Sequence, residues 1–279
     1  MPYFKTYPTQ SIRVGDRLLT FEKPVIMGIL NVTPDSFFDG GQHATVDHAI
    51  AHTRQMLEEG ADIIDIGAFS SRPGATTIST QEEIDRSVPV VEALAKEFPD
   101  IILSVDTFRA EVAKTCIDAG AHIINDISGG NLDENMFATV AKLQVPYVLM
   151  HMRGTPKTMQ QLTDYTDIVT DVATELGQRI AALRALGVKD IILDPGFGFA
   201  KTIEQNYELL LRTDELHYFG LPMLGGISRK SMIYKKLDTT PQEALNGTTA
   251  LNTLLLERGV HILRVHDVKE AKQLINLFF

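Results

Sequence analysis

The chain has 279 residues, 44% of them hydrophobic and 22% charged, so it can bury a large core and is not a disordered tail. Its net charge of −10 argues against a general nucleic-acid-binding surface or an anionic membrane partner, so any bound anion needs a local basic cluster. The single cysteine, Cys116, excludes an internal disulfide framework and a cysteine-based zinc site.

The first ten residues, MPYFKTYPTQ, carry neither the basic segment nor the apolar segment that opens a secretory signal. No run of about 18 apolar residues occurs in the chain, so no transmembrane helix is expected. We therefore expect a soluble protein of the reducing cytoplasm that is neither secreted nor anchored to a membrane.

Residues 11–21, SIRVGDRLLTF, predict a β-hairpin ahead of the first buried strand. After it, a unit of short apolar strand, polar strand end and amphipathic helix recurs eight times. Strands are expected at 25–30, 62–67, 101–106, 122–128, 146–152, 190–195, 221–228 and 261–267. Helices are expected between them, for example at 45–60, 81–98, 166–187 and 241–259.

Several predicted helices end at a glycine just before the next strand, where a C-cap with positive φ favours this residue; they are Gly60, Gly120, Gly187 and Gly259. Alternating helices and near-continuous apolar strands are typical of a parallel sheet covered by helices. Eight repeats favour an α/β fold with a single (β/α)8 TIM barrel whose bottom the hairpin closes. We divide the chain into a hairpin extension, residues 1–22, and the barrel, residues 23–279.

In such a barrel the carboxyl ends of all strands meet at one face, where barrel enzymes carry their active sites. The polar residues expected there are Asn31, Asp65, Asp106, Asn125, His151, Asp194, Ser228, Arg264 and His266. A strand-end Asp or Asn more often caps the next helix than it catalyses, and for Asp65 and His151 we keep that structural interpretation. Asp194 precedes the loop PGFGF, which places it poorly as a cap and leaves its carboxylate for a ligand.

Arg264 and His266 are two residues apart on the last strand, so their side chains lie on the same side of it. A buried arginine is costly without an anion, and barrels commonly bind phosphate beside strands 7 and 8, so the pair predicts an anion site. Arg229 and Lys230 add positive charge after the seventh strand. Arg72 lies in a loop rich in hydroxyl groups and could contact a diphosphate through both guanidinium nitrogens, unless that loop is an ordinary surface turn.

Taken together, these stretches closely resemble the dihydropteroate synthase family, the folate-pathway enzymes that sulfonamides inhibit. The resemblance runs from residue 25 to residue 267. It rests on ILNVTPDSF (29–37) with its Gly pair, GAFSSRPGA (67–75), SVDT (104–107), INDISGG (124–130), LMHMRG (149–154), LDPGFGFAK (193–201), ISRKSMI (227–233) and RVHD (264–267). So many motifs in family order are far more specific than any single spacing.

The resemblance implies an alkyl- or aryl-group transferase of folate biosynthesis. It would join 6-hydroxymethyl-7,8-dihydropterin diphosphate to 4-aminobenzoate, giving 7,8-dihydropteroate and pyrophosphate. The resemblance also implies Mg²⁺ as cofactor, sulfonamides as inhibitors and a homodimer. The leaving pyrophosphate and the delocalised pterin cation suggest an SN1-like substitution.

The resemblance assigns site residues one by one. The pterin pocket would comprise Asp106, Asn125, Met150, Asp194, Gly226 and Lys230. The diphosphate site would comprise Asn31, Ser71, Arg72, Arg264 and His266, with Asn31 as the metal ligand. The 4-aminobenzoate site would comprise Phe37, Ser71, Pro73, Phe199 and Ser231. Catalytic roles would fall to Asp35, Arg72, Lys230, Arg264 and His266.

The loops that carry Asp35, Phe37 and residues 71–73 are expected to close over 4-aminobenzoate and exclude water. Here Phe69-Ser70-Ser71 stands where many relatives have an acid followed by Ser-Thr. Ser71 keeps the hydroxyl group, so this departure bears on sulfonamide sensitivity more than on catalysis.

Two alternatives stay open. A pterin-binding methyltransferase domain acting with a corrinoid partner would share the barrel but would need no diphosphate site, so Asn31, Arg72, Arg264 and His266 count against it. A non-catalytic pterin-binding module would not need the loop motifs and Lys230, which are intact here.

Overall fold

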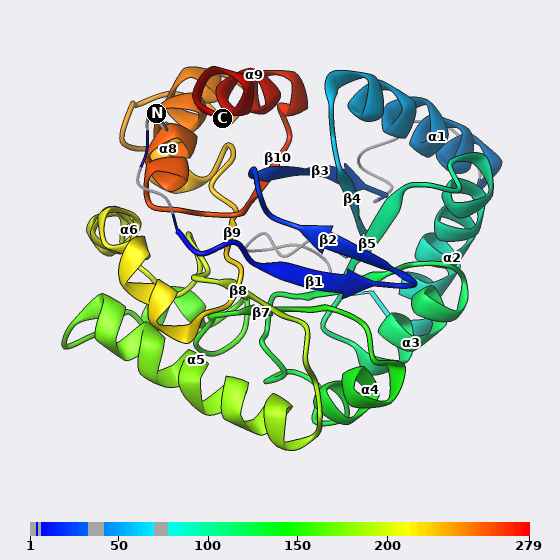
Figure 1. The fold of residues 1–279 in the computed structure, drawn as a ribbon, viewed down its shortest axis with the longest axis horizontal. Helices are drawn as coiled ribbons and strands as arrows, with labels where there is room; N and C mark the ends of the chain where they lie inside the picture. Colours follow the sequence, from blue (N-terminus) through cyan, green and yellow to red (C-terminus); the bar gives the residue numbers. More distant parts are fainter. Residues whose placement is uncertain (1–3, 5–6, 33–41, 70–77) are drawn as a thin grey trace.

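The computed structural model describes residues 4, 7–32, 42–69 and 78–279, without the side chains of residues 42–44. Its central feature is a ring of parallel strands (Figure 1): β3 (Val25–Asn31), β4 (Ile63–Gly67), β5 (Ile102–Asp106), β6 (Ile123–Asp126), β7 (Tyr147–Met150), β8 (Ile191–Asp194), β9 (Leu224–Gly225) and β10 (Ile262–Val265). The strand order is β8-β7-β6-β5-β4-β3-β10-β9. A parallel bridge between Leu193 and Met223 brings β8 beside β9. The predicted TIM barrel is therefore confirmed.

The helices surround the barrel (Figure 1): α1 (Gln42–Glu59), α2 (Thr80–Glu97), α3 (Ala110–Asp118), α4 (Met136–Leu143), α5 (Ile168–Ala185), α6 (Ile203–Leu211), α7 (Ser231–Tyr234), α8 (Leu245–Glu257) and α9 (Val268–Phe278). The structure also contains two short 3-10 helices, η2 (Met159–Gln161) and η3 (Thr213–Phe219). Within the described ranges, no helix has the length and apolar character needed to cross a membrane.

The predicted bounds differ most from the structure in two elements. The helix expected from residue 241 begins at Leu245. The strand expected at 221–228 shortens to Leu224–Gly225. A Cβ atom on Gly225 would lie 2.6 Å from Leu255 Cδ1 of α8, so any larger residue there would require the Leu255 side chain to shift.

The helix-ending glycines adopt the backbone conformation that the sequence predicts. Gly60, Gly120, Gly187 and Gly259 have φ values of +103°, +116°, +86° and +77°. Residues with a Cβ rarely adopt positive φ, so each glycine allows a helix to end and the next strand to begin within a few residues.

The amino-terminal hairpin lies across the ring of strands in Figure 1 and consists of β1 (Ser11–Val14) and β2 (Arg17–Thr20). Its buried Ile12 and Val14, followed by Phe21, pack with inward-facing strand residues such as Met27 and Ile63. The hairpin therefore closes the bottom of the barrel with apolar side chains.

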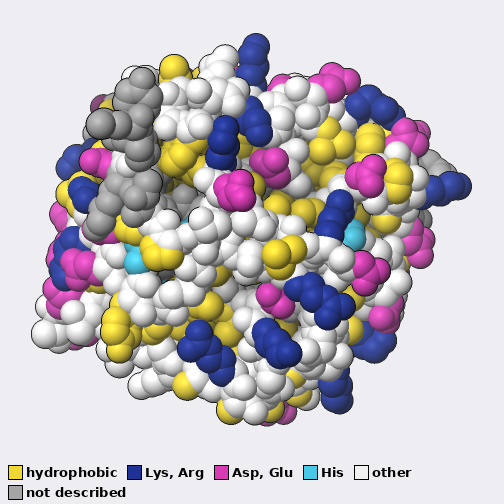
Figure 2. Space-filling view, in the orientation of Figure 1, with side chains coloured by type: hydrophobic (Ala, Val, Ile, Leu, Met, Phe, Trp, Pro, Cys, Tyr) yellow, Lys and Arg dark blue, Asp and Glu magenta, His cyan; other side chains and the backbone are white. Residues whose placement is uncertain are grey.

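On the face that Figure 2 shows, acidic and basic side chains are interspersed.

A second, larger core lies between the strands and the helices and includes Leu30, Leu103 and Leu193. With the bottom of the barrel filled by apolar side chains, its polar interior residues are confined to the carboxyl end. The fold thus leaves one end of the barrel for chemistry.

Candidate active site

The register of the sheet aligns predicted site residues from neighbouring strands. Asn31 pairs with Gly67, Gly67 pairs with Asp106, and Asp106 pairs with Asn125. These four residues therefore lie in a row across the carboxyl ends of β3, β4, β5 and β6.

Arg264, on β10, extends across the barrel interior to two carboxylates. Its Nε donates to Oδ2 of Asp65 and its Nη2 donates to Oδ2 of Asp106, both at 2.7 Å. Asp65 is fully buried and also accepts from Ser104 Oγ at 2.6 Å and from Asn125 Nδ2 at 2.9 Å. Burial alone would lower the pKa of Arg264, but Asp65 and Asp106 raise it, so the guanidinium stays charged.

The helix-cap interpretation of two strand-end residues was wrong. The side chain that caps α2, the helix after Asp65, belongs to Ser79. His151 instead contacts Glu175 of α5 at 3.1 Å. The argument that Arg264 must await an external anion also needs correction, because protein carboxylates already balance its charge.

Asp106, Asp194 and Lys230 form the electrostatic centre of the site. Burial raises the pKa of Asp106 to about 7, against the opposing effect of Arg264. Burial also raises the pKa of Asp194, against the opposing charge of Lys230. For Lys230, burial lowers the pKa to about 8, and Asp194 and Asp106 both act against that shift. Two carboxylates whose ionised forms are poorly solvated thus lie near one ammonium group, and a ligand with N–H donors would stabilise them.

Two glycines leave space beside these charged groups. A Cβ atom on Gly226 would lie 3.8 Å from both Arg264 Cβ and Lys230 Nζ. A Cβ atom on Gly67 would lie 3.7 Å from Oδ1 of Asn31, whose side chain is exposed. A methyl group at either position would therefore make ordinary contacts with these functional side chains.

The loop between β8 and α6 forms one wall of the site. Its Phe197 carbonyl accepts from Lys230 Nζ at 2.6 Å, and the same Nζ lies 4.8 Å from the centre of the Phe199 ring. Phe199 belongs to an apolar cluster with Met150 of β7. Ser231, half-buried, begins α7 directly after Lys230. Predicted pterin and 4-aminobenzoate residues thus meet around Lys230.

Side chains also connect the loop after β9 with the end of β10. Ser228 Oγ lies 3.1 Å from His266 Nδ1 and accepts from the His266 backbone N–H at 3.2 Å. Arg229 Nε donates to Asp267 Oδ2 at 3.0 Å. Arg229 is thus engaged with a carboxylate, so its predicted contribution to an anion cluster needs correction.

The sequence interpretation missed Lys201, which is 3% exposed and contacts His151 at 3.0 Å. The available signal was the position of this lysine, directly after the GFGFA segment and before a helix, since lysines are rarely buried. It also missed Ser104 as a donor to Asp65. The predicted site residues outside the described ranges are Asp35, Phe37, Ser71, Arg72 and Pro73.

Comparison with known proteins agrees with this geometry. Residues 27–266 match the family model described as pterin binding enzyme. The chain is 46% identical over 255 residues to the dihydropteroate synthase of Escherichia coli strain K12, which covers 91% of this chain and 90% of that protein.

Solved structures agree as well. The Yersinia pestis dihydropteroate synthase in a sulfonamide drug complex has a TM-score of 0.91 and 45% identity, covering 96% of this chain and 98% of that one. The Xanthomonas albilineans dihydropteroate synthase with 4-aminobenzoic acid has a TM-score of 0.89 and 40% identity, covering 96% and 97%. As its motifs predicted, the chain belongs to the pterin-binding enzyme family and, within it, to the dihydropteroate synthases.

Proposed function

We propose that this chain condenses 6-hydroxymethyl-7,8-dihydropterin diphosphate with 4-aminobenzoate, giving 7,8-dihydropteroate and pyrophosphate. The observation that carries the proposal is the pair of carboxylates with raised pKa, Asp106 and Asp194, near Lys230. The amino and N–H groups of a pterin ring would donate to these carboxylates, while Lys230 would donate to the ring carbonyl. A molecule without those donors would leave a buried carboxylate unpaired, at a cost of about 1–3 kcal/mol.

The second substrate would bind beside Phe199 and Ser231. The Xanthomonas albilineans relative holds 4-aminobenzoic acid, and the Yersinia pestis relative holds a sulfonamide drug, which supports the same ligand classes here. Phe37, Ser71 and Pro73 complete this site by family resemblance. Sulfonamides would then compete with 4-aminobenzoate for it.

The diphosphate would lie near Asn31, Arg264 and His266, with Ser71 and Arg72 added by family resemblance. Asn31 fits a magnesium site because its exposed carboxamide oxygen lies at the strand end beside Gly67, and Mg²⁺ binds through few protein oxygens while keeping several waters. Bound Mg²⁺ would supply positive charge against the diphosphate oxygens.

In the proposed reaction the bond between the pterin methylene carbon and the diphosphate oxygen breaks, and its electron pair leaves with pyrophosphate. Arg264 and His266, together with Arg72, would stabilise that developing charge. The amine nitrogen of 4-aminobenzoate then bonds to the methylene carbon and loses a proton. Asp106 and Asp194 would keep the pterin oriented throughout, and Asp35, by family resemblance, would act near the incoming amine.

The homodimer, the cytoplasmic location and the division at residue 22 stay predictions.

Cys116 is buried, and burial raises the pKa of its thiol to about 12, so this thiol is poorly suited to reaction as a thiolate.

The direct test is turnover by the purified chain. With Mg²⁺, the pterin diphosphate and 4-aminobenzoate, we expect pyrophosphate and dihydropteroate to form in equal amounts, since one bond breaks for each bond that forms. Pyrophosphate release is measured with a coupled assay and dihydropteroate by chromatography. Folded protein that forms neither product would contradict the proposal.

The SN1-like step predicts reversible bond breaking before the amine attacks. The substrate is labelled with ¹⁸O in the oxygen that joins the methylene carbon to phosphorus, and 4-aminobenzoate is left out. In recovered substrate the label should then also occupy non-bridging positions on that phosphorus, which NMR would detect. A label that stays in place, with bond breaking only when the amine is present, would indicate a concerted displacement instead.

Gly226→Ala should separate ligand binding from folding. Its methyl group would make ordinary contacts at 3.8 Å, so unfolding free energy should change by less than about 0.5 kcal/mol. Because the methyl fills space beside Arg264 and Lys230, the Kd for free pterin should rise at least about tenfold, a loss of about 1.4 kcal/mol. Calorimetry measures the Kd and urea titration the stability.

Gly187→Ala is the matched control. Gly187 has φ +86° and no neighbouring atom within 4 Å, so alanine should cost about 1 kcal/mol of stability and leave pterin affinity unchanged. Equal pterin affinity in the Gly226 variant and the wild type would exclude Gly226 from the pocket.

A further inference from the structure

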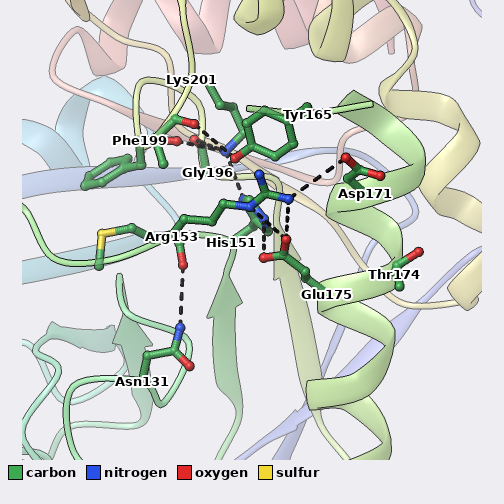
Figure 3. A network of polar contacts seen from close by, with 12 residues as sticks. Asn131, His151, Arg153, Tyr165, Asp171, Thr174, Glu175, Gly196, Phe199 and Lys201 are labelled. Carbon is green, nitrogen blue, oxygen red and sulfur yellow. Dashed lines mark hydrogen bonds and ion pairs between the residues drawn. The ribbon is translucent and has the colours of Figure 1, made fainter. Parts of the chain in front are cut away.

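A polar network centred on the buried residues His151 and Lys201 contacts backbone carbonyls of the loop between β8 and α6 (Figure 3). Its centre is Lys201, whose Nζ donates to the carbonyls of Gly196 and Phe199 at 2.9 and 3.0 Å. The third contact of Nζ, at 3.0 Å, is Nδ1 of His151. An ammonium group has three donors, and all three are used here.

The network continues through His151 to α5. Because His151 Nδ1 accepts from Lys201, its proton lies on Nε2, which donates to Glu175 at 3.1 Å. Glu175 also accepts from Arg153 Nε at 2.8 Å. Burial and the charge of Lys201 together lower the pKa of His151 to about 4, against the opposing effect of Glu175, so His151 is neutral and can accept. Arg153 in turn lies over the ring of Tyr165, 3.8 Å from its centre.

Tyr165 brings the network back to the same loop, because its hydroxyl donates to the carbonyl of Ala200 at 2.9 Å. Figure 3 shows Tyr165 beside the loop that carries both Phe199 and Lys201. Lys201 and Tyr165 thus bind three carbonyls between residues 196 and 200, while Lys230 binds that of Phe197.

The loop needs such support because its backbone is not one that the chain adopts readily. Gly196, Gly198 and Ala200 have φ values of +72°, +82° and +50°. Ala200 is strained in this conformation, since its Cβ crowds the backbone. A Cβ atom on Gly196 would lie 2.0 Å from the His151 carbonyl oxygen, so the loop backbone packs tightly against the residue that follows β7.

We propose that Lys201 is a positioning residue that fixes the loop 194–201, and thereby the Asp194 carboxylate, the Phe197 carbonyl and the Phe199 ring, for both substrates. Gly196 links Lys201 to Asp194, because its carbonyl accepts from Lys201 and its N–H donates to Asp194 Oδ1 at 2.8 Å. Phe199, whose carbonyl accepts from Lys201, links it to the site of the second substrate. The inference rests on the function proposed above, and Lys201 acts without touching substrate.

The cost of this arrangement supports a positional role. Burial lowers the pKa of Lys201 to about 7, against the opposing effect of Asp194, so enclosing the ammonium group is unfavourable. A methionine would fill similar volume without that cost, but it would leave two loop carbonyls and His151 Nδ1 without a donor.

The test compares Lys201→Met, which keeps no donors, with Lys201→Gln, which keeps two. We expect Lys201→Met to raise the Kd for free 6-hydroxymethyl-7,8-dihydropterin and the KM for 4-aminobenzoate at least tenfold each, and Lys201→Gln to fall between it and the wild type. Hydrogen exchange of the loop amides should speed up in the same order. Tyr165→Phe, which removes only the contact with Ala200, should give a smaller change. If Lys201→Met does not fold, Lys201→Gln and Tyr165→Phe provide the test.

Tyr147→Phe is the matched control, because its buried hydroxyl donates to Asp126 at 2.6 Å and does not contact this loop. It should lower Tm while leaving Kd, KM and loop exchange within twofold of wild type. Lys201 variants that behave like this control would overturn the proposal.

The two proposals fail in different ways. A wild-type chain without turnover would contradict the proposed function alone. Loop amides that exchange at the wild-type rate in folded Lys201→Met would overturn the role of Lys201, with or without turnover.

Discussion

The structure depends most on one buried ion-pair cluster, in which Arg264 bridges Asp65 and Asp106 at the centre of the barrel. The largely buried guanidinium, the fully buried Asp65 and the partly buried Asp106 are costly to desolvate, and each tolerates its environment because the others are present. The cluster also joins β10 to β4 and β5, so the strands that carry the site are held by charge as well as by backbone hydrogen bonds. Both carboxylate oxygens of Asp65 accept hydrogen bonds, from Arg264, Ser104 and Asn125, which makes it a support rather than a binding group.

Asp106 differs from Asp65 in a way that suits ligand binding. It shares the same arginine but is 19% exposed at the mouth of the barrel. Its raised pKa shows that the arginine does not fully compensate its burial. A pterin that donates hydrogen bonds to Asp106 would further compensate the burial of its carboxylate. Among the residues that the structure describes, Lys201, Arg229 and Ser228 make side-chain hydrogen bonds in the loops after β8, β9 and β10, which favours a preorganised arrangement of that part of the site.

The sequence predicted the repeating architecture well, because strand and helix periods, glycine C-caps and polar strand ends are local signals. It predicted the partners of buried charges poorly. Arg264 and Asp65 are 199 residues apart, so their contact exists only once the barrel closes. Likewise, Arg229 was predicted to contribute to an anion site, but it pairs with Asp267, which lies 38 residues further along the chain. Lys201 was missed because a single buried lysine has no periodic pattern, and β9 was overestimated because the apolar run around it is longer than its paired part, Leu224–Gly225.

The central claim, that Arg264 and Asp65 act as one unit, is tested most directly by a double-mutant cycle on unfolding free energy with Asp65→Asn, Arg264→Met and the double variant. Each single variant should cost about 3–5 kcal/mol, because the remaining charge or its partner is left unmatched in the interior. The double variant should cost less than the sum by about 2 kcal/mol. Costs that add to within about 0.5 kcal/mol would contradict the account, since the two residues would then stabilise the barrel independently.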